Sequence, residues 1–153
     1  MCWSIAMLHN KKWKFEPKMS VVANSFNSEQ NLHEFGIRYI SNFLNRFGFA
    51  ILKVNSDPNH PSQILASLHD RSLLIAVRTA CHPDIGKIDS QALELLVRES
   101  EELDVKPYFT GLSIIPKATN NVERDSSRHD QEYTVIFNGI IAVSKSQLLV
   151  ANG

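Results

Sequence analysis

Apolar residues recur every three or four positions between Leu32 and Phe47, and this spacing predicts an amphipathic helix. The stripe consists of Leu32, Phe35, Tyr39, Ile40, Phe43, Leu44 and Phe47. Asn27 or Ser28 can cap its start, because short polar side chains accept hydrogen bonds from the free N–H groups there. Gly48 predicts its end, since glycine readily adopts the left-handed conformation that often follows a helix.

Apolar segments further along the chain predict β-strands at residues 49–54, 63–68, 73–79 and 107–115. The second and third are joined by the polar turn His69–Ser72, which predicts a hairpin. Leu73–Val77 is apolar on both faces, as is typical of a central strand that is covered on both sides. The segment Asn55–Pro61 contains two X-Pro pairs and predicts a loop, because proline cannot continue a helix or a central strand.

A second helix is predicted from Gln91 to about Leu103, capped by Asp89 or Ser90. Its inward-facing residues are expected to be Ala92, Leu93, Leu96 and Leu103. Glu94 and Arg98 are four residues apart, so they are expected to pair on the exposed side.

The C-terminal part combines Tyr133–Phe137, Asn138-Gly139 and Ile140–Val143, which predicts a β-hairpin with a type I′ turn. Both arms are apolar on both faces. Either another layer of the domain covers them, or they form a contact between subunits. A homodimer through the hairpin Tyr133–Val143 is therefore one hypothesis.

The 153 residues predict one α/β domain at 28–146, interrupted by a polar loop at about 117–132. Residues 1–27 are expected to form a flexible N-terminal segment and residues 147–153 a C-terminal tail. Either Met1 or Met19 can be the natural start. Lys plus Arg equals Asp plus Glu, at sixteen each. This balance disfavours tight non-specific nucleic-acid binding, although it allows a local basic face.

The number of cysteines and the lengths of the apolar runs indicate the cellular compartment in which the protein is expected. Only Cys2 and Cys81 are present, which favours a reducing cytoplasm over a disulfide scaffold. Cys81-His82 is either half of a metal site or a structural cysteine at a strand end. The second interpretation is favoured because no partner has ligand spacing. No apolar run approaches the roughly 20 residues that span a bilayer, so no membrane contact is expected.

The order helix, strand, hairpin, helix, strand from about Leu32 to Pro116 resembles that of small bacterial members of the PD-(D/E)xK nuclease superfamily. Their signature runs GxIDLIA, a short turn, then FVEVKTR. Residues 63–66 (QILA) stand where this family has DLIA, and residues 75–79 (IAVRT) stand where it has VEVKT. The family's YL, GY and IL correspond to Phe43-Leu44, Gly48-Phe49 and Ile51-Leu52. The resemblance implies a restriction-endonuclease-like fold, in which helices flank a mixed β-sheet.

The chain departs from this family at the positions that hold the metal. The family's aspartate, glutamate and lysine are replaced by Gln63, Ala76 and Arg78. Mg²⁺ needs hard oxygen ligands, normally including carboxylates, and neither Gln63 nor Ala76 supplies one. We therefore expect no metal, no cofactor and no metal-dependent phosphodiester cleavage at this place. Arg78 is a candidate for binding a phosphate or another anion, unless it forms an ion pair with an acid such as Asp84 or Glu94.

Three functions remain open at this point. The first is a catalytically inactive nuclease-like domain that binds nucleic acid or a protein partner. The second is an active Mg²⁺-dependent nuclease whose acids have moved into the loops, and the third is an unrelated α/β module that self-associates through the hairpin. The loop residues available for the second are Asp57, His60, His69, Asp70, His82, Asp84 and Asp89. Turn-forming aspartates and surface histidines are the simpler interpretation of that set.

Overall fold

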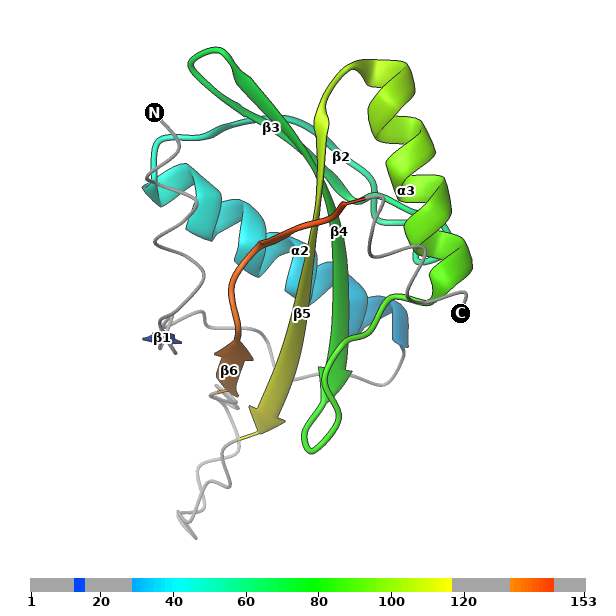
Figure 1. Cartoon of the computed structure of the whole chain (residues 1–153). Coiled ribbons are helices and arrows are strands. Elements are labelled where there is room, and N and C mark those ends of the chain that lie inside the picture. Colours follow the sequence, from blue (N-terminus) through cyan, green and yellow to red (C-terminus); the bar gives the residue numbers. More distant parts are fainter. Residues whose placement is uncertain (1–12, 16–28, 117–132, 145–153) are drawn as a thin grey trace, which may run out of the picture.

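A computed structural model describes residues 13–15, 29–116 and 133–144 (Figure 1). Within the predicted N-terminal segment, Trp13–Phe15 is described and forms strand β1. The predicted helix caps Asn27 and Ser28, the polar loop at 117–132 and the tail at 147–153 lie outside the described residues.

Two helices are described, α2 (Glu29–Arg46) and α3 (Ser90–Leu103). Gly48 follows α2 with a φ of 88°, so the predicted stop is confirmed. Asp89 is the N-cap of α3, as predicted, and its carboxylate accepts a hydrogen bond from the Ala92 N–H at 2.7 Å. Neither of these helices is long and apolar enough to cross a membrane.

The described strands form one sheet in the order β1-β6-β5-β4-β3-β2, with β7 also paired to β5. They are β1, β2 (Ala50–Val54), β3 (Ile64–Leu68), β4 (Arg71–Cys81), β5 (Lys106–Pro116), β6 (Tyr133–Phe137) and β7 (Ile141–Ala142). Strands β4 and β5 are parallel, and α3 is the crossover between them; the other pairs are antiparallel. The predicted fold class, a mixed β-sheet flanked by helices, is confirmed.

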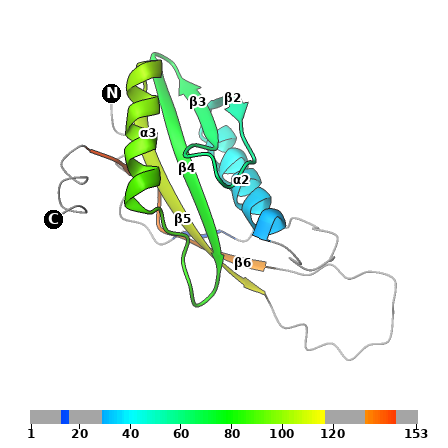
Figure 2. The same ribbon diagram turned by 90° about the vertical axis from the view of Figure 1, so that its right-hand side faces the viewer.

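One helix covers each face of the sheet (Figure 2). Helix α2 buries its stripe against β4, β2 and β3, and Phe43 meets Phe137 edge to face at a centroid distance of 4.9 Å. On the opposite face, Leu96 of α3 packs with Leu74 and Ala76 of β4. All of Leu73–Val77 is buried, so the prediction of a doubly covered central strand is confirmed.

Two of the predicted core positions are wrong. Phe47 is 46% exposed, because it follows the last residue of α2. Leu103 is 50% exposed, because it is the final residue of α3 and borders a cavity instead of the core. The predicted ion pair on the outer side of α3 is confirmed, since Arg98 lies 3.7 Å from Glu94.

The predicted C-terminal hairpin is wrong. Strands β6 and β7 both run antiparallel along the same edge of β5, β6 opposite 112–116 and β7 opposite 108–109. A type I′ turn needs two successive positive φ angles, but here Gly139 has one (100°) and Asn138 does not. Gly139 therefore bends a single extended segment instead of reversing it.

This arrangement also explains why both arms are apolar. Val135, Phe137 and Ile140 are buried in the core on the α2 side of the sheet. Ile136 and Ile141 are the exposed ones, at 37% and 38%. Another layer of the same domain thus covers one face, which was the first of the two alternatives. The hypothesis of self-association through Tyr133–Val143 loses the hairpin on which it was based.

Candidate functional site

The hairpin β3–β4 brings together Gln63, Ala76 and Arg78, the three positions that the sequence comparison with the nuclease signature singled out. Ile64 pairs with Ile75, so Gln63 lies at the start of β3 beside Ala76. The Gln63 N–H donates to the Ile75 carbonyl at 2.9 Å, which holds this register. The side chains of Gln63 and Arg78 are in direct contact.

Gln63 is only 1% exposed, and internal hydrogen bonds occupy its side-chain amide. Its Oε1 accepts from the Val77 N–H at 2.8 Å and from Arg78 Nη1 at 2.7 Å. Its Nε2 donates to the His60 carbonyl at 2.7 Å. The backbone pairing of β3 with β4 starts at Ile64 and Ile75. The Gln63 amide extends it by one further hydrogen bond, to the Val77 N–H. Because both acceptor positions of Oε1 are used, this oxygen is not free to bind a cation.

Ala76 is fully buried under α3 and contributes a methyl group to the core. Its neighbours there are Leu74 and Leu96. A longer acidic side chain at this position would have to displace apolar groups, so the surroundings suit the alanine that is present.

Arg78 is half-buried and binds neutral oxygen atoms. In addition to Gln63, its Nη1 donates to the Val77 carbonyl at 3.0 Å, and its Nη2 donates to the Pro61 carbonyl at 3.5 Å. Burial lowers the pKa of this guanidinium, and the charge of Asp89 acts in the opposite direction. Arg78 thus remains a cation in a partly desolvated place.

The ion pairs expected for Arg78 do not form. Over residues 29–116 and 133–144, no carboxylate lies within ion-pair distance of its guanidinium. Glu94 is turned to Arg98 instead. The hydrogen bonds of the Arg78 guanidinium therefore all go to neutral oxygens, and the charge of Asp89 acts on it only from beyond ion-pair distance.

The backbone of the loop after β4 lies directly on the strand beside Arg78. A Cβ at Gly86 would overlap the Arg78 carbonyl, and the Gly86 N–H donates to the Leu112 carbonyl at 3.0 Å. Only glycine permits this approach, which fixes the backbone of β4 at the base of the arginine.

His33 of α2 is a site residue that the pattern of the sequence did not reveal. It is 6% exposed, and its Nε2 is buried without a hydrogen-bond partner. Burial, then the charge of Arg78, lower its pKa, whereas Glu34 and Asp57 raise it. The sequence offers one signal for this residue, its position on the helix. His33 lies one helical turn before Gly36, and Gly36 packs directly on Thr79, which follows Arg78 in β4.

The acidic and histidine residues of the loops do not converge. Asp57 accepts from the Asn59 N–H within its own turn, and Asp89 caps α3. His69-Asp70 forms the turn before β4, whereas His82 and Asp84 follow the end of this 11-residue strand. Within the described part of the chain, no three His, Cys, Asp or Glu side chains gather closely enough to hold a metal ion. Cys81 ends β4, as expected of a structural cysteine, but it is exposed.

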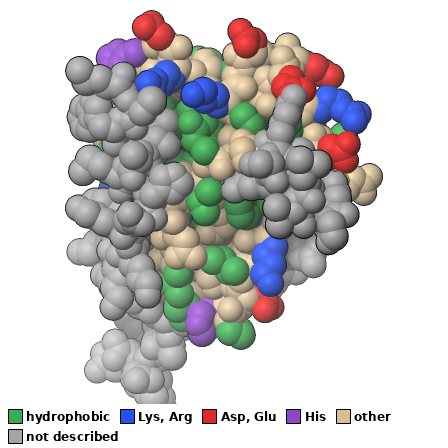
Figure 3. Space-filling model, in the orientation of Figure 1, with side chains coloured by type: hydrophobic (Ala, Val, Ile, Leu, Met, Phe, Trp, Pro, Cys, Tyr) green, Lys and Arg blue, Asp and Glu red, His purple; other side chains and the backbone are tan. Residues whose placement is uncertain are grey.

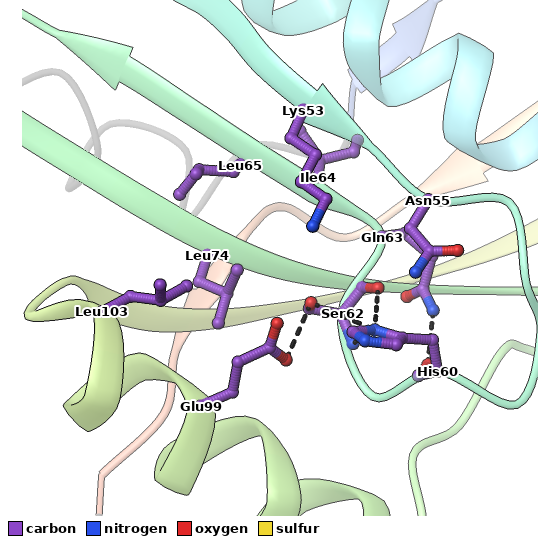
Figure 4. A pocket seen from close by; sticks show the side chains of 10 residues that line it. All are labelled: Lys53, Asn55, His60, Ser62, Gln63, Ile64, Leu65, Leu74, Glu99 and Leu103. Atoms are coloured by element: carbon purple, nitrogen blue, oxygen red, sulfur yellow. Dashed lines mark hydrogen bonds between the residues drawn. The ribbon is translucent and has the colours of Figure 1, made fainter.

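A second polar cluster lies next to Gln63, in a cavity of about 90 Å³ between α3 and the strands β2 to β4 (Figure 4). Ser62 Oγ donates to Glu99 at 2.9 Å, and the Ser62 carbonyl lies 2.8 Å from His60 Nδ1. The complete lining is Lys53, Asn55, His60, Ser62, Gln63, Ile64, Leu65, Leu74, Glu99 and Leu103. Sequence reasoning missed this cavity, because its walls come from segments that are far apart in the chain.

The charges on the visible face are mixed. Figure 3 shows hydrophobic side chains along its middle and side chains of both signs toward its edges. Extensive contact with a phosphate backbone is therefore not favoured on this face by the described side chains.

Residues 30–143 match the family described as "Domain of unknown function (DUF8840)", and the chain belongs to this family. No protein of curated function matches its sequence. The chain is similar in structure to the Holliday junction resolvase Hjc of the archaeal hyperthermophile Archaeoglobus fulgidus. The TM-score is 0.44 at 15% sequence identity, over 78% of this chain and 97% of the resolvase.

Proposed function

We propose that this protein is a nuclease-like domain of the PD-(D/E)xK type that does not cleave, and that it binds nucleic acid through Arg78. The observation that carries the proposal is the half-buried guanidinium of Arg78, which contacts only neutral oxygens. A phosphate oxygen would supply the missing negative charge in a bidentate geometry that suits arginine.

The surroundings of Arg78 support the loss of cleavage. Metal-dependent hydrolysis needs carboxylates that hold a cation next to the attacked phosphate. In their place stand an amide whose oxygen is already used and a buried methyl group. A phosphate bound by Arg78 would thus be held without an activated water.

Salt-dependent binding of a fluorescent DNA duplex and of a single strand, measured by anisotropy, tests the binding. Arg78→Met removes the charge and keeps the apolar stem, and Arg98→Met is the matched control on the exposed side of α3. We expect Arg78→Met to weaken binding about tenfold or more and to reduce the slope of log K against log salt by about one. Arg98→Met should change affinity less than about twofold.

The proposal fails for nucleic acid if wild-type protein binds neither DNA nor RNA at low salt, or if both arginine variants weaken binding equally. The first outcome would leave a protein partner as the ligand of this scaffold.

The alternative function, an active nuclease whose acids have moved into the loops, is tested with the same purified protein. Wild-type protein is incubated with supercoiled, linear and branched DNA and with Mg²⁺ or Mn²⁺. We expect no cleavage. Cleavage that disappears in Asp70→Ala or Asp84→Ala would show that a displaced site exists and would overturn the proposal.

A further inference from the structure

The cavity beside α3 carries opposite charges on opposite walls. Lys53 enters from β2 and Glu99 from α3, and both side chains point into the space between them (Figure 4). They do not pair: in the described structure neither takes part in an ion pair. Two unlike charges that line one cavity without touching can each bind the opposite charge of a ligand.

The carboxylate of Glu99 is held in position. Ser62 is 5% exposed and donates its hydroxyl to Glu99 Oε2 at 2.9 Å, so that oxygen points toward the loop. The same serine lies against His60, whose Nδ1 is 2.8 Å from the Ser62 carbonyl oxygen and 3.3 Å from the Ser62 backbone nitrogen. Glu99 Oε1 has no hydrogen-bond partner among the described residues. This oxygen is therefore a fixed acceptor for a cationic group.

The body of the cavity between the two charges is apolar. Leu65 and Leu74 of the sheet form its floor, and Leu103, which is 50% exposed, stands at its edge. A volume of about 90 Å³ has room for about three water-sized groups, since one water occupies about 30 Å³. A ligand of this size would bury a short aliphatic chain and leave part of itself in solvent.

We propose that this cavity binds a small zwitterion with an aliphatic body, of the chemistry of an apolar amino acid, with its ammonium on Glu99 and its carboxylate on Lys53. Each feature of such a ligand has a counterpart: the fixed carboxylate of Glu99, the ammonium of Lys53 and the apolar floor. The cavity adjoins the anion site, because Gln63 lines it and also contacts Arg78. The charges that would bind the zwitterion are those of Lys53 and Glu99, so neither proposal depends on the other.

Amide NMR of the folded protein, titrated with L-leucine, tests the proposal. We expect saturable shifts for Ser62, Leu65 and Glu99, with a dissociation constant on the order of 1 mM, as is typical of so few contacting atoms. N-acetylleucine lacks the ammonium and leucinamide lacks the carboxylate, so each should bind at least about fivefold more weakly.

Two conservative variants assign the ends of the ligand. Glu99→Gln keeps the shape and an acceptor for Ser62, and Glu94→Gln is its control on the exposed side of the same helix. Lys53→Met keeps the aliphatic stem, and the exposed Lys106→Met is its control. Each cavity variant should weaken leucine binding at least about fivefold, and each control less than about twofold.

The proposal is overturned if leucine produces no saturable shifts around the cavity. It is also overturned if leucinamide and N-acetylleucine bind as well as leucine, since the two charges would then have no role. A direct Lys53–Glu99 ion pair in solution, visible as contacts between the two side chains in the unliganded protein, would likewise contradict it.

Discussion

Arg78 Nη1 donates to Gln63 Oε1 at 2.7 Å, and the same oxygen accepts the Val77 N–H at 2.8 Å. One buried amide thus completes the ladder of β4 and orients the guanidinium that we propose as the anion site. Gln63 has the structural role and Arg78 the proposed binding role. We therefore expect a variant at Gln63 to lower stability and a variant at Arg78 to lower affinity.

Replacing Gln63 by leucine should destabilise the domain. The Val77 N–H would be left unsatisfied inside the protein, and Arg78 would lose its shortest hydrogen bond. We expect a loss of about 2–4 kcal/mol in the free energy of unfolding, measured by urea denaturation. Gln91→Leu, at an exposed position in the first turn of α3, should change it by about 0.5 kcal/mol or less. Equal effects of the two variants would contradict the role given to Gln63.

Introducing the two acids and the lysine of the PD-(D/E)xK signature should create a metal site. We expect the triple variant Gln63→Asp, Ala76→Glu, Arg78→Lys to bind Mg²⁺ or Mn²⁺. At a metal concentration ten times its dissociation constant, the free energy of unfolding should rise by about 1.4 kcal/mol. The wild-type protein and the double variant that keeps Ala76 should gain less.

The triple variant will start from a lower stability, because residue 76 is fully buried beside Leu74 and Leu96. Circular dichroism must therefore first establish that it folds. A folded triple variant without any stabilisation by metal would argue against the alignment with the nuclease family.

His33 should make stability depend on pH. Its pKa in the folded protein lies below its ordinary value of 6.5, because of burial and then Arg78. The unfolded chain therefore binds more protons, so the contribution is fully present above pH 6.5 and is lost as pH falls from there through the folded pKa. His33→Gln should flatten this part of the curve of unfolding free energy against pH.

The same histidine reports on its neighbour. Arg78→Met removes one of the causes that lower the pKa of His33, so this pKa should rise. NMR titration of the imidazole C–H signals measures it directly. An unchanged His33 pKa in this variant would mean that the two charges do not interact.

Gly86→Ala should be costly, because the added methyl group meets the backbone of Arg78, which cannot rotate away. We expect a loss of about 2–3 kcal/mol in urea denaturation. Gly48→Ala is the control, since a Cβ there meets only Leu68 Cδ1 at an ordinary contact distance of 3.7 Å, and the cost comes from its positive φ of 88°. About 1 kcal/mol is expected there. A smaller effect at Gly86 than at Gly48 would show that the loop moves freely away from β4.

Local patterns of apolar and turn-forming residues predicted much of the fold. The structure agrees with the cap at Asp89, the stop at Gly48, the central strand at Leu73–Val77 and, except for Phe47, the stripe on α2. Each of these depends on neighbours within a few residues, where periodicity and turn chemistry act directly. The resemblance to the nuclease signature also implied that Gln63, Ala76 and Arg78 would lie together, and the register of β3 and β4 brings them together.

Tertiary structure decided the rest. Asn138-Gly139 has the local signature of a turn, yet β5 is long enough to pair with both flanking segments, and this pairing prevailed over the hairpin. The orphan Nε2 of His33 and the unpaired charges of Lys53 and Glu99 arise where separate elements meet. The sequence by itself determined which segments form elements and which of their faces are apolar. Which strand accepts which partner, and which polar groups are left facing a cavity, depend on competition between distant segments that no local pattern encodes.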